Sequence, residues 1–193
     1  MATSRSADIL AAALELFTRY GYEATTMADI GTAVGIRGPS LYRHVASKQT
    51  ILDAIMTKTM LDLLAGHRAA IGTTDDVTEQ LKRAVESHVR YHARHRMEAF
   101  VGNRELRSLE EPRRSHVIGL RAEYEQAFRS LIVTGVETGR FRLTSPRLAS
   151  FAILDLGMGL SAWYREDGEL TEDELVWQYT DFALRLVGTA SPN

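Results

Sequence analysis

The 193-residue sequence contains no cysteine and only four prolines. Without cysteine the chain forms no disulfide, no zinc–cysteine site and no thiol nucleophile. Low-complexity tracts are also missing, so we expect an ordered protein throughout. The alternation of apolar and polar residues that marks a half-buried strand is found nowhere, whereas apolar residues recur at helical spacing along the chain. The sequence therefore predicts an all-α fold of about nine helices.

Long apolar runs are missing as well. The longest weakly charged run, residues 148–164, is broken by Asp155 and is shorter than the ~20 residues that a membrane-spanning helix needs. The first residues carry Asp8 and Glu15 within their apolar stretch and have no basic leader, so they do not resemble a signal peptide. We expect a soluble, cytoplasmic protein.

Catalytic signatures are also lacking. There is no HExxH motif and no glycine-rich phosphate loop. His88, His92 and His95 have the i, i+4, i+7 spacing at which imidazoles on one helix face can share a metal ion. Because three arginines accompany them and no carboxylate lies among them, we interpret this face as a pocket wall or as a polar face for an anionic ligand. We expect no enzyme activity, no cofactor and no metal; a small helical metal-binding protein or enzyme is the alternative.

The most informative stretch is residues 25–48. Thr26, followed three residues later by an aspartate, is typical of a helix N-cap with a capping box, and a short apolar face follows. Gly35 then supplies the positive φ that a sharp turn after a helix needs. Pro39 suits the first position of a second short helix, residues 39–45. Short helix, glycine turn and short helix together indicate a helix-turn-helix.

The second of these helices has an unusual set of exposed groups. A leucine and a valine four residues apart face the core, so Ser40, Tyr42, Arg43 and His44 project elsewhere. Segment 36–48 contains no acidic residue, although the whole chain has a net charge of -2. Such a helix can enter a DNA major groove, read base edges and bind phosphates at its flanks. The alternative is a surface helix whose polar face is only solvated.

The stretch GIRGPSLYRHVASKQTIL, preceded by ILAAALELFTRYGYEATTMADI, resembles the DNA-binding domain of the TetR family of transcriptional repressors. The resemblance covers about residues 5 to 55. It implies contacts to DNA backbone or bases from Thr26, Ser40, Tyr42, His44 and Lys48, with Arg37, Gly38, Pro39 and Arg43 at their borders. Gly38 departs from the many relatives that carry a base-reading side chain there, so we expect readout to depend on the neighbouring arginines and the main chain.

The resemblance also implies two domains with different functions. Residues 1–47 would form the DNA-binding domain and residues 48–193 a helical ligand-binding and dimerisation domain, with helix 48–65 connecting the two. The expected partners are double-stranded DNA with a palindromic operator, a second copy of the chain and a small-molecule effector. The last two predicted helices, residues 146–165 and 171–188, are rich in large apolar residues, so we expect them to form the dimer contact.

The effector site is expected in the second domain, and a largely apolar effector is expected. Its predicted lining residues are His88, His92, Phe100, Arg104, Tyr124, Phe128, Phe151, Met158 and Trp163. Segment 162–171, AWYREDGELT, is similar to a turn of TetR-type repressors that acyl-CoA thioesters release from DNA, which makes an acyl-CoA one candidate effector. In the alternative interpretation, Trp163 and Arg165 only hold the turn between the last two helices.

Overall fold

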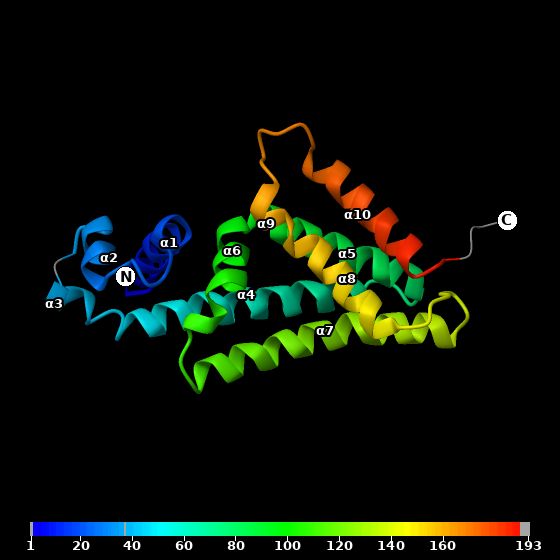
Figure 1. Cartoon of the computed structure of the whole chain (residues 1–193), viewed down its shortest axis with the longest axis horizontal. Helices are drawn as coiled ribbons and strands as arrows, with labels where there is room; N and C mark the ends of the chain where they lie inside the picture. Colours follow the sequence, from blue (N-terminus) through cyan, green and yellow to red (C-terminus); the bar gives the residue numbers. More distant parts are fainter. Residues whose placement is uncertain (1, 37, 190–193) are drawn as a thin grey trace. The chain divides into compact units, whose positions relative to one another are not determined.

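The computed structural model describes residues 2–36 and 38–189 (Figure 1). Within these ranges all regular elements are helices and none is a strand, which confirms the predicted all-α fold. None of these helices is both long and apolar enough to span a bilayer. The helices are α1 (Ala2–Tyr20), α2 (Met27–Ala33), α3 (Gly38–Leu41), α4 (Lys48–Ile71), α5 (Val77–Arg94), α6 (Arg96–Glu105), the 3₁₀ helix η1 (Leu106–Ser108), α7 (Arg113–Glu137), α8 (Pro146–Met158), α9 (Leu160–Trp163) and α10 (Glu172–Leu186).

Contacts divide the chain into two compact units. Unit 1 comprises Met1–Met60 and Met97–Gly119, and unit 2 comprises Leu61–Arg96 and Leu120–Asn193. Helices α4 and α7 each begin in unit 1 and end in unit 2. This division differs from the boundary expected after residue 47, because the first half of α4 and the segment from α6 to the start of α7 share the core of unit 1.

Unit 1 is held together by one apolar core. The core draws on every helix of the unit, since its buried members include Ile9 and Phe17 of α1, Ile30 of α2, Leu41 of α3, Ile51 and Leu52 of α4, Val101 of α6, Leu109 after η1 and Val117 of α7. Burial of this apolar surface is the main favourable term for the unit. It fixes the helix-turn-helix against α1 and α4.

Local signals define the helix-turn-helix as predicted. Thr26 and Asp29 form the complete capping box at the start of α2. Gly35 has φ +69°, and the amide of Ile36 donates to the Gly31 carbonyl at 2.8 Å. A Cβ at Gly31 would lie 2.8 Å from the Ile36 carbonyl oxygen, so the turn also depends on a glycine inside α2.

The second helix of the motif is shorter than predicted. Instead of residues 39–45, α3 comprises only Gly38–Leu41, and residues 42–44 form a turn. The Leu41 carbonyl accepts from the amides of both His44 and Val45, at 2.9 and 3.1 Å. This shared acceptor tightens the backbone and ends the regular helix, as is common at helix termini.

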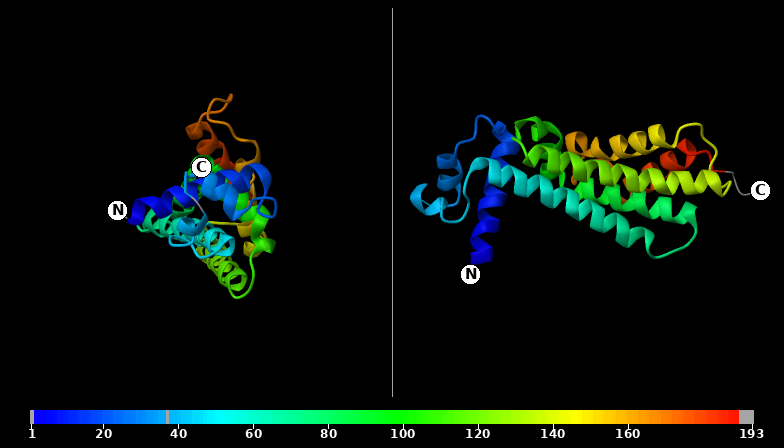
Figure 2. Two further views of the ribbon diagram at one scale, coloured as in Figure 1. Left: turned by 90° about the vertical axis from the view of Figure 1, so that its left-hand side faces the viewer. Right: turned by 90° about the horizontal axis from the view of Figure 1, so that it is seen from below.

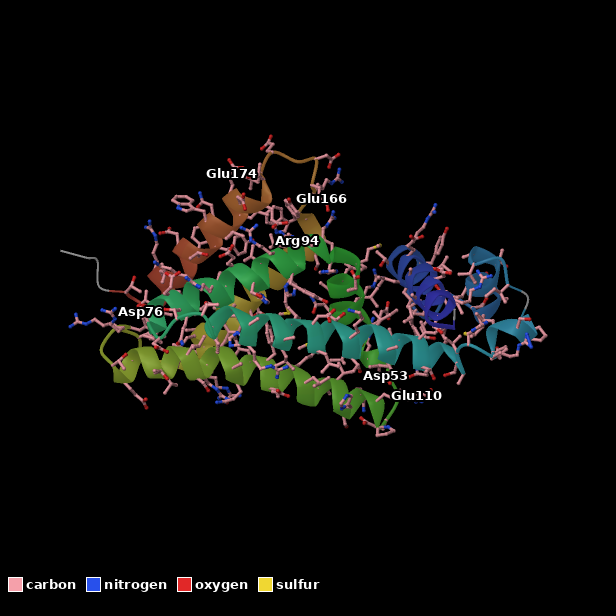
Figure 3. The ribbon with its side chains drawn as sticks, turned by 180° about the vertical axis from the view of Figure 1, so that it is seen from behind. Asp53, Asp76, Arg94, Glu110, Glu166 and Glu174 are labelled. Carbon is pink, nitrogen blue, oxygen red and sulfur yellow. The ribbon has the colours of Figure 1, made fainter. Side chains whose placement is uncertain are left out.

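Unit 2 is built around α5, α8 and α10, which lie side by side in Figures 1 and 2. Asp76 caps α5 and Thr171 caps α10 with a capping box, while Ser145 and Pro146 begin α8. Figure 3 shows Asp76 and Arg94 at opposite ends of α5. Helix 146–165, expected as one element, is interrupted at Gly159 and gives α8 and α9.

The connecting helix is longer than expected. The prediction ended it at residue 65, but α4 continues to Ile71 through Gly66. A glycine inside a helix is unfavourable by about 1 kcal/mol relative to alanine, yet a Cβ at Gly66 would lie 2.9 Å from the Ser87 hydroxyl oxygen of α5. The glycine therefore permits close packing of α4 on α5 rather than ending the helix.

Candidate functional site

The first candidate site is the exposed surface after the glycine turn of unit 1. Tyr42 is 56% exposed, Arg43 and His44 are exposed, Pro39 is exposed and Ser40 is half-buried. We call these five residues the reading surface. Leu41 and Val45 are buried on the opposite side, as expected. Gly38 begins α3, and Arg37 lies outside the described residues.

Thr26 is exposed at the start of α2, and its hydroxyl is fully used in the cap. The Thr26 hydroxyl oxygen accepts from the Asp29 amide at 3.1 Å, and the hydroxyl donates to the Asp29 carboxylate at 2.6 Å. Hydrogen bonds from the side chain and then the backbone of Thr26 lower the pKa of Asp29. Thr26 thus orients the helix that precedes the reading surface.

Lys48, expected to contact DNA, has its ammonium group engaged inside unit 1. Its Nζ donates to the carbonyl oxygens of Tyr22 and Thr25, both at 2.8 Å, and lies 4.2 Å from the centroid of the Tyr22 ring. A third carbonyl, of Glu23, lies at 3.5 Å. The three donors of an ammonium group are thereby occupied, so in this structure Lys48 ties the start of α4 to the loop between α1 and α2.

Gln49 extends this connection and was not predicted. Its amide nitrogen donates to the Tyr22 hydroxyl at 2.9 Å and to the Ser108 carbonyl at 2.7 Å. Its carbonyl oxygen accepts from the amide of Glu110 at 3.1 Å; Glu110 and Asp53 of α4 are labelled in Figure 3. A glutamine one residue into a helix gives no sequence signal for such a role, because all three partners depend on the tertiary fold.

Glu105 belongs to the same network. Its carboxylate is 9% exposed and accepts from the Ser108 hydroxyl at 3.0 Å and from the Tyr22 amide at 3.4 Å, while the Arg104 guanidinium lies 3.8 Å away. The charge pair of Arg104 and Glu105 therefore has a buried carboxylate, which packs against the loop that leads into α2.

The second candidate site is a buried group of histidines and aromatic rings in unit 2. We call it the histidine–aromatic cluster; its members are His67 of α4, His88 and His92 of α5, and Tyr124 and Phe128 of α7. All five side chains are buried, and neighbouring ring centroids lie 4.2 to 6.0 Å apart. Four of the nine predicted ligand-binding residues are thus brought together, and His67 is an addition that the sequence analysis missed.

Hydrogen bonds fix the ring states of the two α5 histidines. His88 Nε2 lies 3.1 Å from the Leu154 carbonyl oxygen, which can only accept, so Nε2 carries the proton. His88 Nδ1, 3.0 Å from the Tyr124 hydroxyl, is then the acceptor in a neutral ring. His92 Nδ1 donates to the His88 carbonyl at 2.9 Å. A Cβ at Gly157 would lie 2.2 Å from His88 Cδ2, so this glycine makes room for the ring.

Burial keeps this cluster uncharged. It lowers the pKa of His67 and of His92 to about 4, and it lowers the pKa of His88 well below the usual value. Burial also raises the pKa of Tyr124. The cluster therefore presents neutral hydrogen-bonding groups at pH 7.

The remaining predicted ligand-binding residues lie elsewhere. Phe100 and Arg104 belong to unit 1, where the guanidinium carbon lies 5.7 Å from the centroid of the phenylalanine ring. Phe151 and Trp163 are 42% and 51% exposed, and Met158 is half-buried. For the residues of α8, the sequence could not distinguish packed from exposed apolar side chains, because the helix has apolar residues on both sides.

Two of the three arginines beside the α5 histidines, Arg90 and Arg94, are paired with acids. Arg90 contacts Glu172 at 2.5 Å and Asp173 at 2.8 Å, and Arg94 contacts Glu172 at 2.7 Å. The Glu172 hydrogen bond is the first cause that raises the pKa of Arg90. The expectation that these arginines face an anionic ligand does not fit this geometry; they connect the end of α5 to the start of α10.

An apolar face on α8 and α10 is exposed. We call it the α8/α10 face; its large apolar members are Leu148, Phe151, Leu156, Phe182 and Leu186. Part of it, including Leu156, Phe182 and Leu186, lines a shallow groove. Exposed apolar area of this kind marks an interaction surface.

Two family models match the chain. Residues 9–55 match the model described as bacterial regulatory proteins, tetR family, and residues 74–187 match the model described as tetracyclin repressor-like, C-terminal domain. The first match covers the reading surface and the second covers most of unit 2.

Individual proteins agree with these matches. The HTH-type transcriptional repressor KstR2 of Rhodococcus jostii is 29% identical over 193 residues, which covers 99% of this chain and 94% of the relative. A solved structure of a bacterial regulatory protein in the tetR family from Rhodococcus RHA1 has a TM-score of 0.91 at 31% identity and covers 96% of this chain and 98% of its own. The structure of the ketosteroid transcriptional regulator KstR2 of Mycobacterium tuberculosis has a TM-score of 0.89 at 26% identity and covers 96% of each chain. With the helix-turn-helix geometry of unit 1 and a family model over more than half of its length, the chain belongs to the TetR family of bacterial regulatory proteins.

Proposed function

We propose that this protein is a transcriptional repressor that binds a palindromic operator as a homodimer and is released by a small-molecule effector. Family membership supports a DNA-binding regulator, and the Rhodococcus relative is named a repressor. The observation that carries the proposal is the reading surface of unit 1. Its exposed tyrosine, arginine and histidine follow directly on a buried leucine that fixes α3.

In the proposed complex, α3 and the turn after it enter the major groove. Tyr42, Arg43 and His44 would contact base edges and phosphates, and Ser40 would donate a hydroxyl near the start of the helix. Arg37 and Gly38 would supply contacts at the border, with Gly38 offering main chain only. The amide end of α2, capped by Thr26, would lie against a phosphate. Lys48 would act mainly by holding the loop before α2.

Dimerisation supplies the second reading surface. One short helix makes few phosphate contacts and would bind weakly by itself, whereas a two-fold dimer doubles those contacts on half-sites about one helical turn apart. We propose that the α8/α10 face forms this dimer contact, because it combines large apolar side chains with the groove beside Phe182. Phe151, expected in the ligand site, would then lie in the interface.

We place the effector site at the histidine–aromatic cluster. Aromatic side chains with a few neutral polar groups among them suit a largely apolar ligand. Helix α4 carries His67 of the cluster and begins with Lys48 in unit 1, so a ligand that displaces His67 acts on a helix continuous with unit 1. An acyl-CoA is a second candidate effector, whose acyl chain would lie beside Met158 and Trp163, outside the cluster. Native mass spectrometry of the protein purified from its host would reveal an acyl-CoA as a bound mass; a different adduct would redirect the assignment.

The reading surface is tested by operator affinity. An operator is first selected from genomic DNA with the wild-type protein, and its affinity is then measured by fluorescence anisotropy at fixed salt. We expect Tyr42→Ala to weaken binding about tenfold or more and Ser40→Ala about fivefold, typical of lost DNA contacts.

The matched control is Tyr20→Ala. Tyr20 is 55% exposed, as Tyr42 is 56% exposed, and it lies at the end of α1 in the same unit. Its removal should leave operator affinity within about twofold of wild type. Equal losses in both tyrosine variants, or no loss in either, would contradict the proposed reading surface.

A further inference from the structure

His67 is the one member of the histidine–aromatic cluster whose ring nitrogens have no hydrogen-bond partner among the described residues. The residue is 2% exposed. Its ring centroid lies 4.8 Å from that of Phe128 and 6.0 Å from that of Tyr124, and the Tyr124 contact is edge-on. A buried polar group without a partner is costly, and few such groups persist in native proteins without a reason.

The charge state limits what can satisfy this ring. Burial, followed by the charge of Arg68, lowers the pKa of His67 to about 4, so the imidazole is neutral at pH 7. A neutral imidazole has one N–H donor and one acceptor nitrogen. The face of Phe128 can receive an N–H group weakly. An aromatic face offers nothing to the acceptor nitrogen, which needs a donor.

A lone water is a poor candidate for that donor. A buried water needs two to four polar partners, and the described hydrogen bonds of the other polar groups in the cluster join them to one another or to a backbone carbonyl. The Tyr124 hydroxyl donates to His88 Nδ1, His88 Nε2 donates to the Leu154 carbonyl, and His92 Nδ1 donates to the His88 carbonyl. Besides these, the cluster offers the rings of Phe128 and Tyr124, which favour an apolar occupant.

We propose that His67 determines the specificity of the effector site by accepting a hydrogen bond from the hydroxyl group of a neutral, largely apolar alcohol. This inference rests on the proposed function, since it assigns the ligand class of the effector site placed at the cluster. The aromatic rings would contact the hydrocarbon skeleton, and the hydroxyl would satisfy the acceptor nitrogen of His67, for which the described residues offer no donor. A hydrocarbon of the same shape would leave that acceptor unpaired, and a ketone would bring it no donor.

The test uses three probes with one fused-ring skeleton: decalin, 1-decalone and 1-decalol. The full-length protein is first freed of bound molecules, with native mass spectrometry as the check, and each dissociation constant is measured by calorimetry. In wild type we expect 1-decalol to bind about tenfold more tightly than decalin or 1-decalone, which corresponds to one buried hydrogen bond.

Three variants locate the effect. His67→Phe should reduce the preference for the alcohol to less than about twofold. His67→Gln, which keeps a donor and an acceptor, should retain most of the preference. His116→Phe changes an exposed histidine of α7 and should behave as wild type. If His67→Phe does not fold, His67→Leu replaces it.

The outcomes separate this inference from the proposed function. Binding of all three probes with equal affinity would overturn the role of His67 while leaving an effector site in the bundle. Persistence of the alcohol preference in folded His67→Phe would overturn it too, as would a ketone that binds as tightly as the alcohol. Failure of all three probes to bind wild type would contradict both the inference and the placement of the effector site at the cluster.

Discussion

Acidification should destabilise this protein well before its carboxylates titrate, because the histidine–aromatic cluster is buried without charge. Histidine has an ordinary pKa of about 6.5 in an unfolded chain, whereas His67 and His92 have pKa values of about 4 in the folded state. As the pH falls below 6.5, the unfolded state binds protons that the folded state does not bind. Stability from these groups is therefore fully present above pH 6.5 and is lost as the pH falls towards 4.

The size of the effect follows from these pKa values. Between pH 7 and pH 5, each of the two histidines should reduce the free energy of unfolding by about 2 kcal/mol, or about 4 kcal/mol together. His88 acts in the same direction. A domain is typically stable by about 5–15 kcal/mol, so the loss is a large share of the total. The lowered pKa values of Asp76 and Glu172 also reduce stability in acid, but only at lower pH.

The assay is urea unfolding followed by circular dichroism at pH 7, 6 and 5, at fixed ionic strength and protein concentration. His67→Gln removes one buried titrating ring, so its loss of stability between pH 7 and pH 5 should be about 2 kcal/mol smaller than that of wild type. His116→Gln, which changes an exposed ring, should follow wild type. A flat wild-type profile between pH 7 and pH 5, or identical profiles for the two variants, would refute the account of a neutral buried cluster.

Three further predictions concern packing, assembly and the loop before α2. Gly157→Ala should lower the free energy of unfolding by about 1–3 kcal/mol by overpacking the cluster, because its Cβ would lie 2.2 Å from His88. Gly119→Ala, where a Cβ meets nothing within 4 Å, should not destabilise the protein. Equal free energies of unfolding in the two variants would contradict this packing. Phe182→Asp should convert the proposed dimer to monomers in analytical ultracentrifugation. Trp177→Asp, which changes a second exposed residue of α10, should not. A Phe182→Asp variant that stays dimeric would exclude the α8/α10 face as the contact. Lys48→Met should weaken operator binding without changing the slope of log affinity against log salt concentration, because the Lys48 ammonium group binds carbonyl oxygens of the protein. A slope reduced by about one would instead identify a contact between Lys48 and a DNA phosphate.

Short-range signals made the helix-turn-helix predictable from the sequence. The capping box of Thr26, the positive φ of Gly35 and the spacing of Leu41 and Val45 each involve residues within a few positions of one another. The predicted length of α3 was wrong because the Leu41 carbonyl, which accepts from two amides, ends the helix, and the three polar residues that follow Leu41 gave no signal of this end. The predicted end of α4 at residue 65 was wrong because the helix continues through Gly66, whose role is set by a serine on another helix.

The histidine–aromatic cluster, our proposed effector site, was only partly predictable because its contacts join helices far apart in the sequence. His88 and His92 could be predicted from their spacing on one helix. His67 stands alone on α4, and its place in the cluster depends on its contacts with Tyr124 and Phe128. Exposed and packed apolar residues of α8 look alike in the sequence. The network of Gln49 and Glu105 was missed because each of these residues has an ordinary surface role in most helices.

The central claim is that two reading surfaces, related by two-fold symmetry, recognise one operator. The most direct test is to sequence the genomic DNA fragments that the purified wild-type protein retains at physiological salt, with Tyr42→Ala and Tyr20→Ala processed in parallel. The account predicts enrichment of an inverted repeat whose half-sites lie about one helical turn, or a multiple of it, apart, retained by wild type and Tyr20→Ala and lost by Tyr42→Ala. Fragments without a common sequence, or a motif without two-fold symmetry, would contradict it.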